Sequence, residues 1–244
     1  ARAIERAAEL VAEGAHIIDV GGESTRPGAA PVEPREEQAR VLPVIAELRR
    51  RFDVPISIDT RHAAVARAAI EAGADIVNDI SALGDPEMGG VVADSGAGLV
   101  LMHMRGTPAT MQQDPRYDDV VSEVTDELAA RLEAAIAAGI PAERIVVDPG
   151  IGFAKTFEHN LELLARLSHL AKLGRPILLG VSRKAFLGAL IGGAPPAERA
   201  VATAAACVAG LFQGARIFRV HDVKIVREAL QVAAAIQAIS SSPA

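Results

Sequence analysis

The chain has 244 residues, half of them apolar, with 25 Lys and Arg against 31 Asp and Glu, for a net charge of −6. This composition excludes a disordered chain, and an acidic balance without any basic run argues against a nucleic-acid or membrane-surface partner. The single cysteine, Cys207, excludes an internal disulfide. No apolar run reaches the roughly 18 residues of a transmembrane helix. Because the first residues are charged rather than signal-like, we expect a cytoplasmic protein.

Helices and strands are predicted to alternate along the whole chain. A helical pattern over residues 1–13 comes first, and seven short apolar runs are the predicted strands: 16–22, 55–60, 75–80, 99–104, 144–150, 176–182 and 215–221. Further helical patterns cover 36–50, 63–73, 123–139, 198–214 and 223–239. Apolar strands joined by helices indicate a parallel sheet covered on both faces. No shift in composition marks a boundary, so residues 1–244 are predicted to form a single domain.

Seven strands after an initial helix fit a (β/α)8 TIM barrel whose first strand and loop are absent from this sequence. An open, doubly wound sheet is the alternative, and it is disfavoured because no Gly-x-Gly-x-x-Gly turn follows a strand. Active sites of such barrels lie at the C-terminal ends of the strands. All seven predicted strands end in polar or ionisable groups, which favours a shared site over seven unrelated helix caps.

Asp59, Asn78 and Asp148 each follow an apolar run, so they are expected at the mouth of the barrel. A carboxylate accepts two parallel N–H bonds, and two carboxylates with an amide therefore suit the edge of a flat, amino-bearing heterocycle. A metal site is the alternative. It is disfavoured because no paired His/Glu spacing is present and His103 stands alone.

Ser182, Arg183 and Lys184 stand where the sixth predicted strand passes into a helix. Free backbone N–H groups and the helix dipole favour an anionic group there, and Lys184 adds a positive charge. Two alternatives remain open: a Schiff-base lysine, as in barrel aldolases, and a surface cap with two solvated cations.

Arg219 and His221 alternate on the last predicted strand, so they point to the same side. A guanidinium and an imidazole suit a phosphate or pyrophosphate, and loops after the last strands of a barrel often bind phosphate. The alternative is a structural Arg219 paired with Asp222.

The loop over residues 21–34 is rich in Gly and Pro, and its Thr25 and Arg26 are predicted to contact an anion. Phe153 is either a core residue or a pocket wall. Lys155 is either a pocket residue or solvated, and the sequence alone does not decide between these roles.

These motifs, taken in order, resemble bacterial dihydropteroate synthases. The segments that carry the resemblance are IIDVGGESTRPGA, SIDT, VNDI, LMHMRGTPATMQ, DPGIGFAKT, GVSRKAFLG and RVHDV. The resemblance spans essentially the whole chain and implies a (β/α)8 enzyme of folate biosynthesis. Such an enzyme joins 6-hydroxymethyl-7,8-dihydropterin pyrophosphate to p-aminobenzoate, and it releases pyrophosphate and 7,8-dihydropteroate.

The same resemblance implies a role for individual residues. The pterin would be held by Asp59, Asn78, Met102, Asp148, Phe153, Lys184 and Arg219, the pyrophosphate by Arg219 and His221, and p-aminobenzoate by Thr25, Arg26, Pro27 and Ser182. Asp59, Asp148, Lys184 and Arg219 would form the catalytic set. The resemblance further implies Mg²⁺ with the pyrophosphate, a homodimer and a target of sulfonamides.

One segment of the family pattern is missing. The family's first strand is followed by a loop resembling NVTPDSFSDGG, whose Asn is associated with the Mg²⁺, and this sequence lacks both. No metal ligand is therefore expected within the chain. The alternative function is a pterin-binding barrel without synthase activity, either an inactive paralogue or a methyltetrahydrofolate-binding methyltransferase domain. It would have no reason to keep the STRP, SRK and RVH segments. The apolar helix over 197–214 is expected in the core or at a dimer face.

Overall fold

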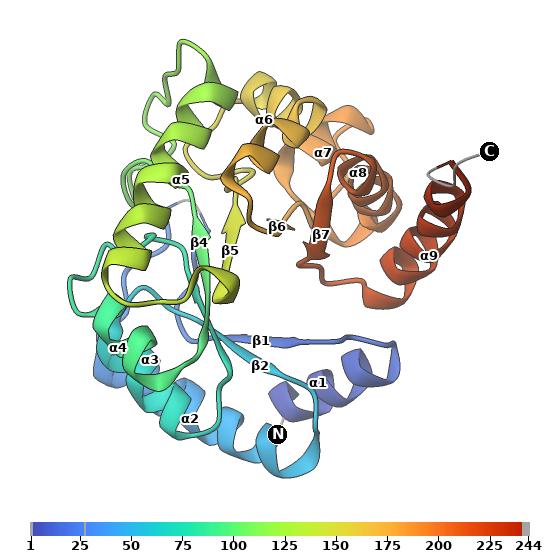
Figure 1. Cartoon of the computed structure of the whole chain (residues 1–244). Coiled ribbons are helices and arrows are strands. Elements are labelled where there is room, and N and C mark those ends of the chain that lie inside the picture. The colour runs from blue at the N-terminus through green and yellow to red at the C-terminus, as the bar shows by residue number, and fades with distance from the viewer. Residues whose placement is uncertain (1, 27, 241–244) are drawn as a thin grey trace.

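A computed structural model of the chain describes residues 2–26 and 28–240, and within these residues seven parallel strands form one sheet in the order β1 to β7. The strands are β1 (Ile18–Gly21), β2 (Ile56–Asp59), β3 (Ile76–Asp79), β4 (Gly98–Met102), β5 (Ile145–Asp148), β6 (Ile177–Leu179) and β7 (Ala215–Phe218). Figure 1 shows that the sheet curls, with the helices on its convex side. The expected parallel α/β fold is confirmed.

Helices lie between successive strands along the chain, with α1 before β1 and α9 after β7. They are α1 (Arg2–Ala12), α2 (Pro34–Arg51), α3 (Ala63–Glu71), α4 (Met88–Ser95), α5 (Val120–Ala137), α6 (Phe157–Ala165), α7 (Ala185–Leu190), α8 (Ala200–Phe212) and α9 (Val223–Ser240). Three short 3₁₀ helices, η1 (Ala142–Arg144), η2 (Leu167–Leu173) and η3 (Pro196–Glu198), lie in the connections. Among the described helices, none is long and apolar enough to cross a membrane.

The two faces of the sheet differ in chemistry because side chains alternate along each strand. In β2, Ile56 and Ile58 are almost fully buried in the main apolar core, whereas Ser57 and Asp59 line the concave side. The convex face thus supplies the contact with the helices, and the concave face carries the polar groups. The strand ends that the sequence singled out lie on this concave side.

The sheet has two free edges. β1 and β7 stand at its two ends, and among the described residues neither strand has a second neighbour. In Figure 1 the two strands face each other across the open side of the curled sheet, with α1 and α9 beside them. Residues of α1, β1, β7 and α9 line one continuous pocket with the strand ends. The described part of the chain is therefore a curled seven-stranded sheet rather than a closed barrel.

Candidate active site

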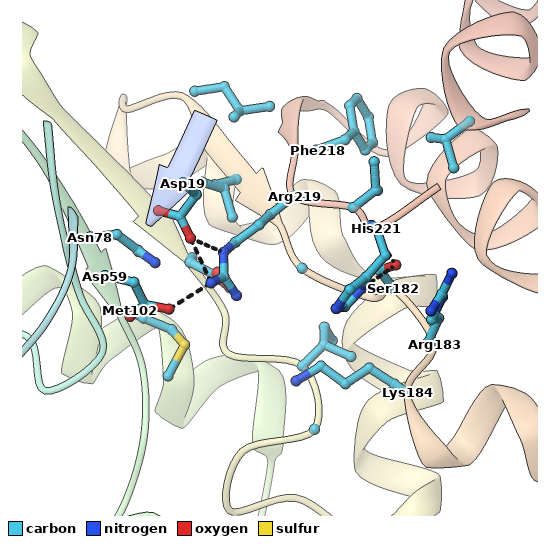
Figure 2. Close-up of a pocket in the computed structure, with 18 of the residues that line it drawn as sticks. Asp19, Asp59, Asn78, Met102, Ser182, Arg183, Lys184, Phe218, Arg219 and His221 are labelled. Atoms are coloured by element: carbon cyan, nitrogen blue, oxygen red, sulfur yellow. Dashed lines mark hydrogen bonds and ion pairs between the residues drawn. The ribbon is translucent and has the colours of Figure 1, made fainter. Parts of the chain in front are cut away.

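Strand register brings the predicted heterocycle-binding groups together. Asp59 pairs with Asn78 across β2 and β3, and Met102 pairs with Asp148 across β4 and β5. All four side chains are buried and line the same pocket. Figure 2 shows Asp59, Asn78 and Met102 on one wall of it. The expectation that these strand ends converge holds in the structure.

Arg219 joins the two edges of the sheet. Its Nη2 lies 2.6 Å from Asp59 Oδ2, and its Nε donates to Asp19 Oδ2 at 2.7 Å. These contacts, drawn in Figure 2, link the end of β7 to β1 and β2. The pairing of Asp19 with Arg219 could not be predicted, because nothing in the sequence relates positions 200 residues apart.

The carboxyl group of Asp59 lies in an unusual environment. Burial raises its pKa to about 7, against the opposing charge of Arg219. Its second oxygen, Oδ1, has no hydrogen-bond partner among the described residues. A buried polar atom without a partner is costly, so this oxygen is positioned to receive a ligand's N–H group or, when protonated, to donate to a ligand.

Lys184 and Asp148 line the same pocket. Lys184 Nζ lies 4.0 Å from the centre of the Phe153 ring, which makes Phe153 a pocket wall as well as a residue of a small apolar cluster. Burial lowers the pKa of Lys184 to about 8, and Asp148 opposes this shift. Asp148 Oδ1 accepts from the backbone N–H of Gly150 at 2.7 Å, which fixes the carboxylate at the end of β5.

Ser182 and His221 contact each other directly. His221 Nδ1 lies 2.9 Å from Ser182 Oγ, which also accepts from the His221 backbone N–H at 3.0 Å. Arg183 binds Asp222 through two bonds of 2.9 and 2.5 Å. The alternative pairing of Arg219 with Asp222 is therefore wrong, because Arg183 occupies that carboxylate.

The helix expected at Ser182 begins later than the sequence suggested. Lys184 is the N-cap of α7, which starts at Ala185 and has only six residues. Ser182 lies in the preceding turn, where Arg183 adopts a positive φ of 59°. The hydroxyl of Ser182, rather than a helix terminus, is the group this position presents to the pocket.

The loop after β1 reaches the same pocket. Thr25 and Arg26 belong to its lining, and the backbone N–H of Gly28 donates to the carbonyl of Pro108 at 3.2 Å. Pro27, which the resemblance implicated, lies outside the described residues. The loop thus lines the pocket and also contacts the segment that follows β4.

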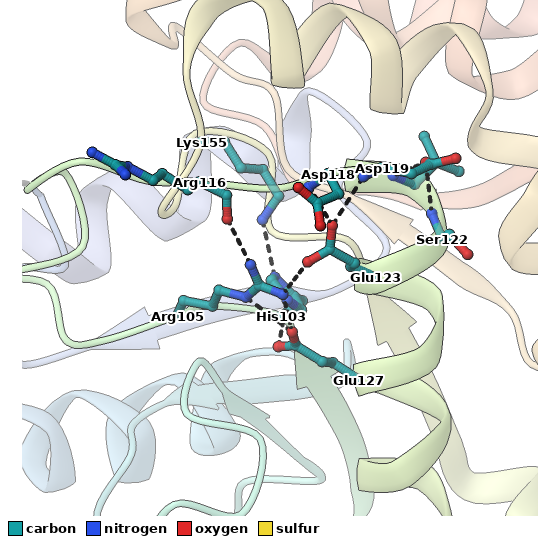
Figure 3. Close-up of polar contacts among 10 residues, drawn as sticks. His103, Arg105, Arg116, Asp118, Asp119, Ser122, Glu123, Glu127 and Lys155 are labelled. Atoms are coloured by element: carbon teal, nitrogen blue, oxygen red, sulfur yellow. Dashed lines mark hydrogen bonds and ion pairs between the residues drawn. The ribbon is translucent and has the colours of Figure 1, made fainter.

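A second polar network lies beside the pocket (Figure 3). Lys155 Nζ contacts His103 Nδ1 at 3.0 Å, and His103 Nε2 contacts Glu127 at 3.0 Å. Arg105 binds both Glu127 and Glu123. Burial lowers the pKa of His103 to about 4 and that of Lys155 to about 7. Lys155 is 3% exposed, so its side chain is buried. Of the two roles that the sequence left open, the solvated one is wrong.

Comparison with known proteins identifies the family of this chain. The family described as pterin binding enzyme matches residues 1–221. A dihydropteroate synthase of Synechocystis sp. is 48% identical over 235 residues, which are 96% of this chain and 81% of that protein. The chain belongs to the dihydropteroate synthase family.

Solved structures of dihydropteroate synthases agree. The Yersinia pestis enzyme with a sulfonamide drug complex superposes with a TM-score of 0.94 at 42% identity, covering 96% of this chain and 85% of that chain. The Xanthomonas albilineans enzyme in complex with 7,8-dihydropteroate gives 0.88 at 40% identity, covering 98% and 85%. The family inferred from the ordered motifs is confirmed. These relatives favour a dihydropteroate synthase over a pterin-binding barrel without synthase activity.

Proposed function

We propose that this chain condenses 6-hydroxymethyl-7,8-dihydropterin pyrophosphate with p-aminobenzoate to give 7,8-dihydropteroate and pyrophosphate. The observation that carries the proposal is the division of one pocket into two kinds of group. Buried carboxylate and amide side chains stand at the ends of β2, β3 and β5, and cationic side chains stand at the ends of β6 and β7. The first kind suits a heterocycle edge and the second a leaving anion.

The pterin is assigned to the buried wall. Asp59, Asn78 and Asp148 offer acceptors and an amide to the ring's amino and N–H edge, and Lys184 adds a donor. Met102 and Phe153 supply apolar faces on which a flat ring packs. The unpartnered Oδ1 of Asp59 supports this assignment, because an N–H donor of the pterin would satisfy it.

The pyrophosphate is assigned to Arg219 and His221. Arg219 is held by Asp19 and Asp59, and these carboxylates keep its guanidinium at the pocket. Mg²⁺ fits the same edge, since the part-exposed carboxylate of Asp19 is a hard oxygen donor, and Mg²⁺ is commonly bound by one or two carboxylates together with substrate phosphates. When bound, the ion would neutralise charge on the pyrophosphate.

p-Aminobenzoate is assigned to the side formed by Thr25, Arg26, Pro27 and Ser182. Arg26 offers a cation to its carboxylate, and the Ser182 hydroxyl can donate to the same group. This arrangement would direct the aniline nitrogen toward the pterin methylene carbon.

In the proposed reaction the C–O bond to pyrophosphate breaks first, and both electrons leave with the oxygen. The pterin-stabilised carbocation is then attacked by the neutral aniline nitrogen, which loses a proton after the C–N bond forms. Asp59 and Asp148 stabilise the cation electrostatically, and Arg219 and His221 stabilise the departing anion. Little acid–base catalysis is required.

The test is titration of the chain with the pterin pyrophosphate in Mg²⁺, followed by addition of p-aminobenzoate and measurement of released pyrophosphate. Binding with release dependent on p-aminobenzoate supports the synthase. Binding without release would favour the alternative, a pterin-binding barrel without synthase activity. Failure of the folded chain to bind would contradict the assignment of the pterin wall.

The proposal also covers the closure of the barrel, the oligomeric state and the location of the protein. We propose that an eighth parallel strand from outside the described residues pairs with β1 and β7, and that residues 1–244 belong to a single barrel domain. The unpaired edges of β1 and β7 and the pocket between them support this closure. Exposed apolar side chains on α8 and α9 support a homodimer. A cytoplasmic location, where folate precursors are made, belongs to the same proposal.

A further inference from the structure

A compact cluster of potential ligand groups lies next to the pocket, where three segments meet. Glu23 belongs to the loop after β1, Glu37 to the first turn of α2, and His62 is the N-cap residue of α3. His62 Nε2 lies 3.8 Å from Glu23 Oε2 and 4.0 Å from Glu37 Oε2. One ligand atom from each residue lies within 4.8 Å of the other two.

Glu37 is buried, and burial raises the pKa of its carboxyl group against the opposing effect of the neighbouring Thr60 side chain. The residue is 0% exposed, and among the described residues neither of its oxygens has a hydrogen-bond partner. The Nε2 atom of His62, which faces it, is equally buried and unpartnered. A carboxylate removed from water without compensation is strongly unfavourable. Two buried polar atoms that face each other without a hydrogen-bond partner indicate that a ligand binds between them.

We propose that Glu23, Glu37 and His62 bind a divalent transition-metal ion of the Zn²⁺ or Mn²⁺ class. Metal–ligand bonds of about 2.1 Å place neighbouring ligand atoms roughly 3.4 Å apart in a tetrahedral site and roughly 3.0 Å apart in an octahedral one. The distances of 3.8 and 4.0 Å are longer than these separations, so the side chains would move together when they bind an ion. One imidazole nitrogen with two carboxylate oxygens suits Zn²⁺ or Mn²⁺ better than Mg²⁺, which prefers oxygen ligands alone.

The neighbouring Arg61 leaves room for such an ion. Its guanidinium binds Glu23 through contacts of 3.0 Å to Oε1 and 3.2 Å to Oε2. An ion bound through Oε2 leaves Oε1 to Arg61, so Glu23 can serve both. Arg61 makes no hydrogen bond with Glu37, although its charge and that of Arg40 act on this carboxyl group.

The position of the ion gives it a structural task. Glu23 lies in the loop that also carries Thr25 and Arg26, and a metal bond would fasten this loop to α2 and α3. The backbone is already close there, since a Cβ on Gly22 would lie 2.8 Å from Glu37 Cγ. An ion at this point would order the start of the loop at the border of the pocket, which Glu23 also lines. This inference does not depend on the proposed reaction.

The experiment is calorimetric titration of the chelator-treated full chain with Zn²⁺ and with Mn²⁺, without substrate or pyrophosphate. Wild type is expected to bind one ion per chain. Glu37→Gln and His62→Asn should each weaken binding by at least about tenfold, while His16→Asn, at an exposed histidine, leaves it unchanged. X-ray absorption of the Zn²⁺ complex should show one nitrogen ligand together with oxygen ligands.

Two results would overturn the proposal. One is a folded wild-type chain that binds neither ion stoichiometrically. The other is an affinity that Glu37→Gln and His62→Asn both leave unchanged while circular dichroism shows native folds. A Glu37→Gln variant that is more stable than wild type at every Zn²⁺ concentration would also count against it, because a proton rather than a metal would then occupy Glu37.

Discussion

Arg219 connects three strands through two carboxylates, and its role in the reaction can be separated from its role in holding the site. Its guanidinium reaches Asp19 and Asp59 at 2.7 and 2.6 Å, so its removal leaves both acids without their cation. Because the pyrophosphate gains charge only as the C–O bond breaks, a cation placed beside it stabilises the transition state more than the bound substrate.

Arg219→Ala is therefore expected to lower kcat by about 10² to 10³, while the affinity for the pterin falls much less. Steady-state pyrophosphate release and titration of the pterin pyrophosphate measure the two effects. Arg116→Ala is the control, since that side chain is 83% exposed and should leave both quantities unchanged. Equal losses in kcat and affinity would contradict the leaving-group role.

Lys155 makes the stability of the protein depend on pH. Burial lowers its pKa from 10.5 to about 7. Between pH 7 and 10.5 the unfolded chain keeps this proton and the folded chain does not, so the free energy of unfolding rises with pH, by up to about 1.4 kcal/mol per pH unit. Because the fold favours the neutral amine, the free energy of unfolding decreases as the pH falls from 10.5 to about 7.

We expect Lys155→Met to remove this dependence. Urea denaturation at pH 7, 8 and 9 should show the wild type gaining stability relative to Lys155→Met at each step. Lys172→Met, at an exposed lysine, is the matched control and should parallel the wild type. Parallel curves for wild type and Lys155→Met would mean that Lys155 stays protonated in the fold.

At the scale of elements, the strands were more predictable than the helices. All seven expected strands form. A parallel strand that is buried on both faces is a continuous apolar run, which can be recognised in the sequence whatever its pairing register. Two helices, α4 and α6, were not predicted, and α7 begins later than the helix expected after Ser182. α4 contains Gly89 and Gly90, α7 has six residues, and α6 is marked chiefly by its Thr156 capping box. Short helices with weak periodicity depend on tertiary packing, which the sequence pattern does not express.

The candidate site also contains residues that could be predicted from the sequence and residues that could not. Asp59, Asn78 and Asp148 could be predicted, because the ends of parallel strands meet at one edge of a sheet. The buried Glu37 could not, since it lies in a charged helix start that looks solvated in sequence. Its neighbours Glu23 and His62 come from separate loops, and no spacing relates the three.

The turn after β5 depends on Gly150. This residue has a φ of 66°, and a Cβ there would lie 1.9 Å from the carbonyl oxygen of His103. Gly150→Ala is expected to lower the free energy of unfolding by more than about 2 kcal/mol and to weaken pterin binding, because the turn holds Asp148 and Phe153. Gly174→Ala, with a φ of 62° and open space around it, should cost only about 1 kcal/mol. Chemical denaturation of both variants checks this, and equal costs would contradict it.

At the scale of the whole molecule, α8 and α9 pack together and carry apolar side chains that the fold leaves exposed. Val201 of α8 is 76% exposed and Val232 of α9 is 63% exposed. Large exposed apolar side chains on two packed helices favour an interaction site there. A second copy of the chain is the occupant that we propose.

The double variant Val201→Glu/Val232→Glu is therefore expected to raise the dimer dissociation constant by at least about 100-fold, because two pairs of carboxylates would be buried in the interface. Sedimentation velocity across a concentration series measures this shift. Ile136→Glu is the control, since Ile136 is 46% exposed but lies on α5. A monomeric wild type at every concentration, or an equal shift in the control, would contradict the dimer. A shift confined to the double variant would place the interface on α8 and α9.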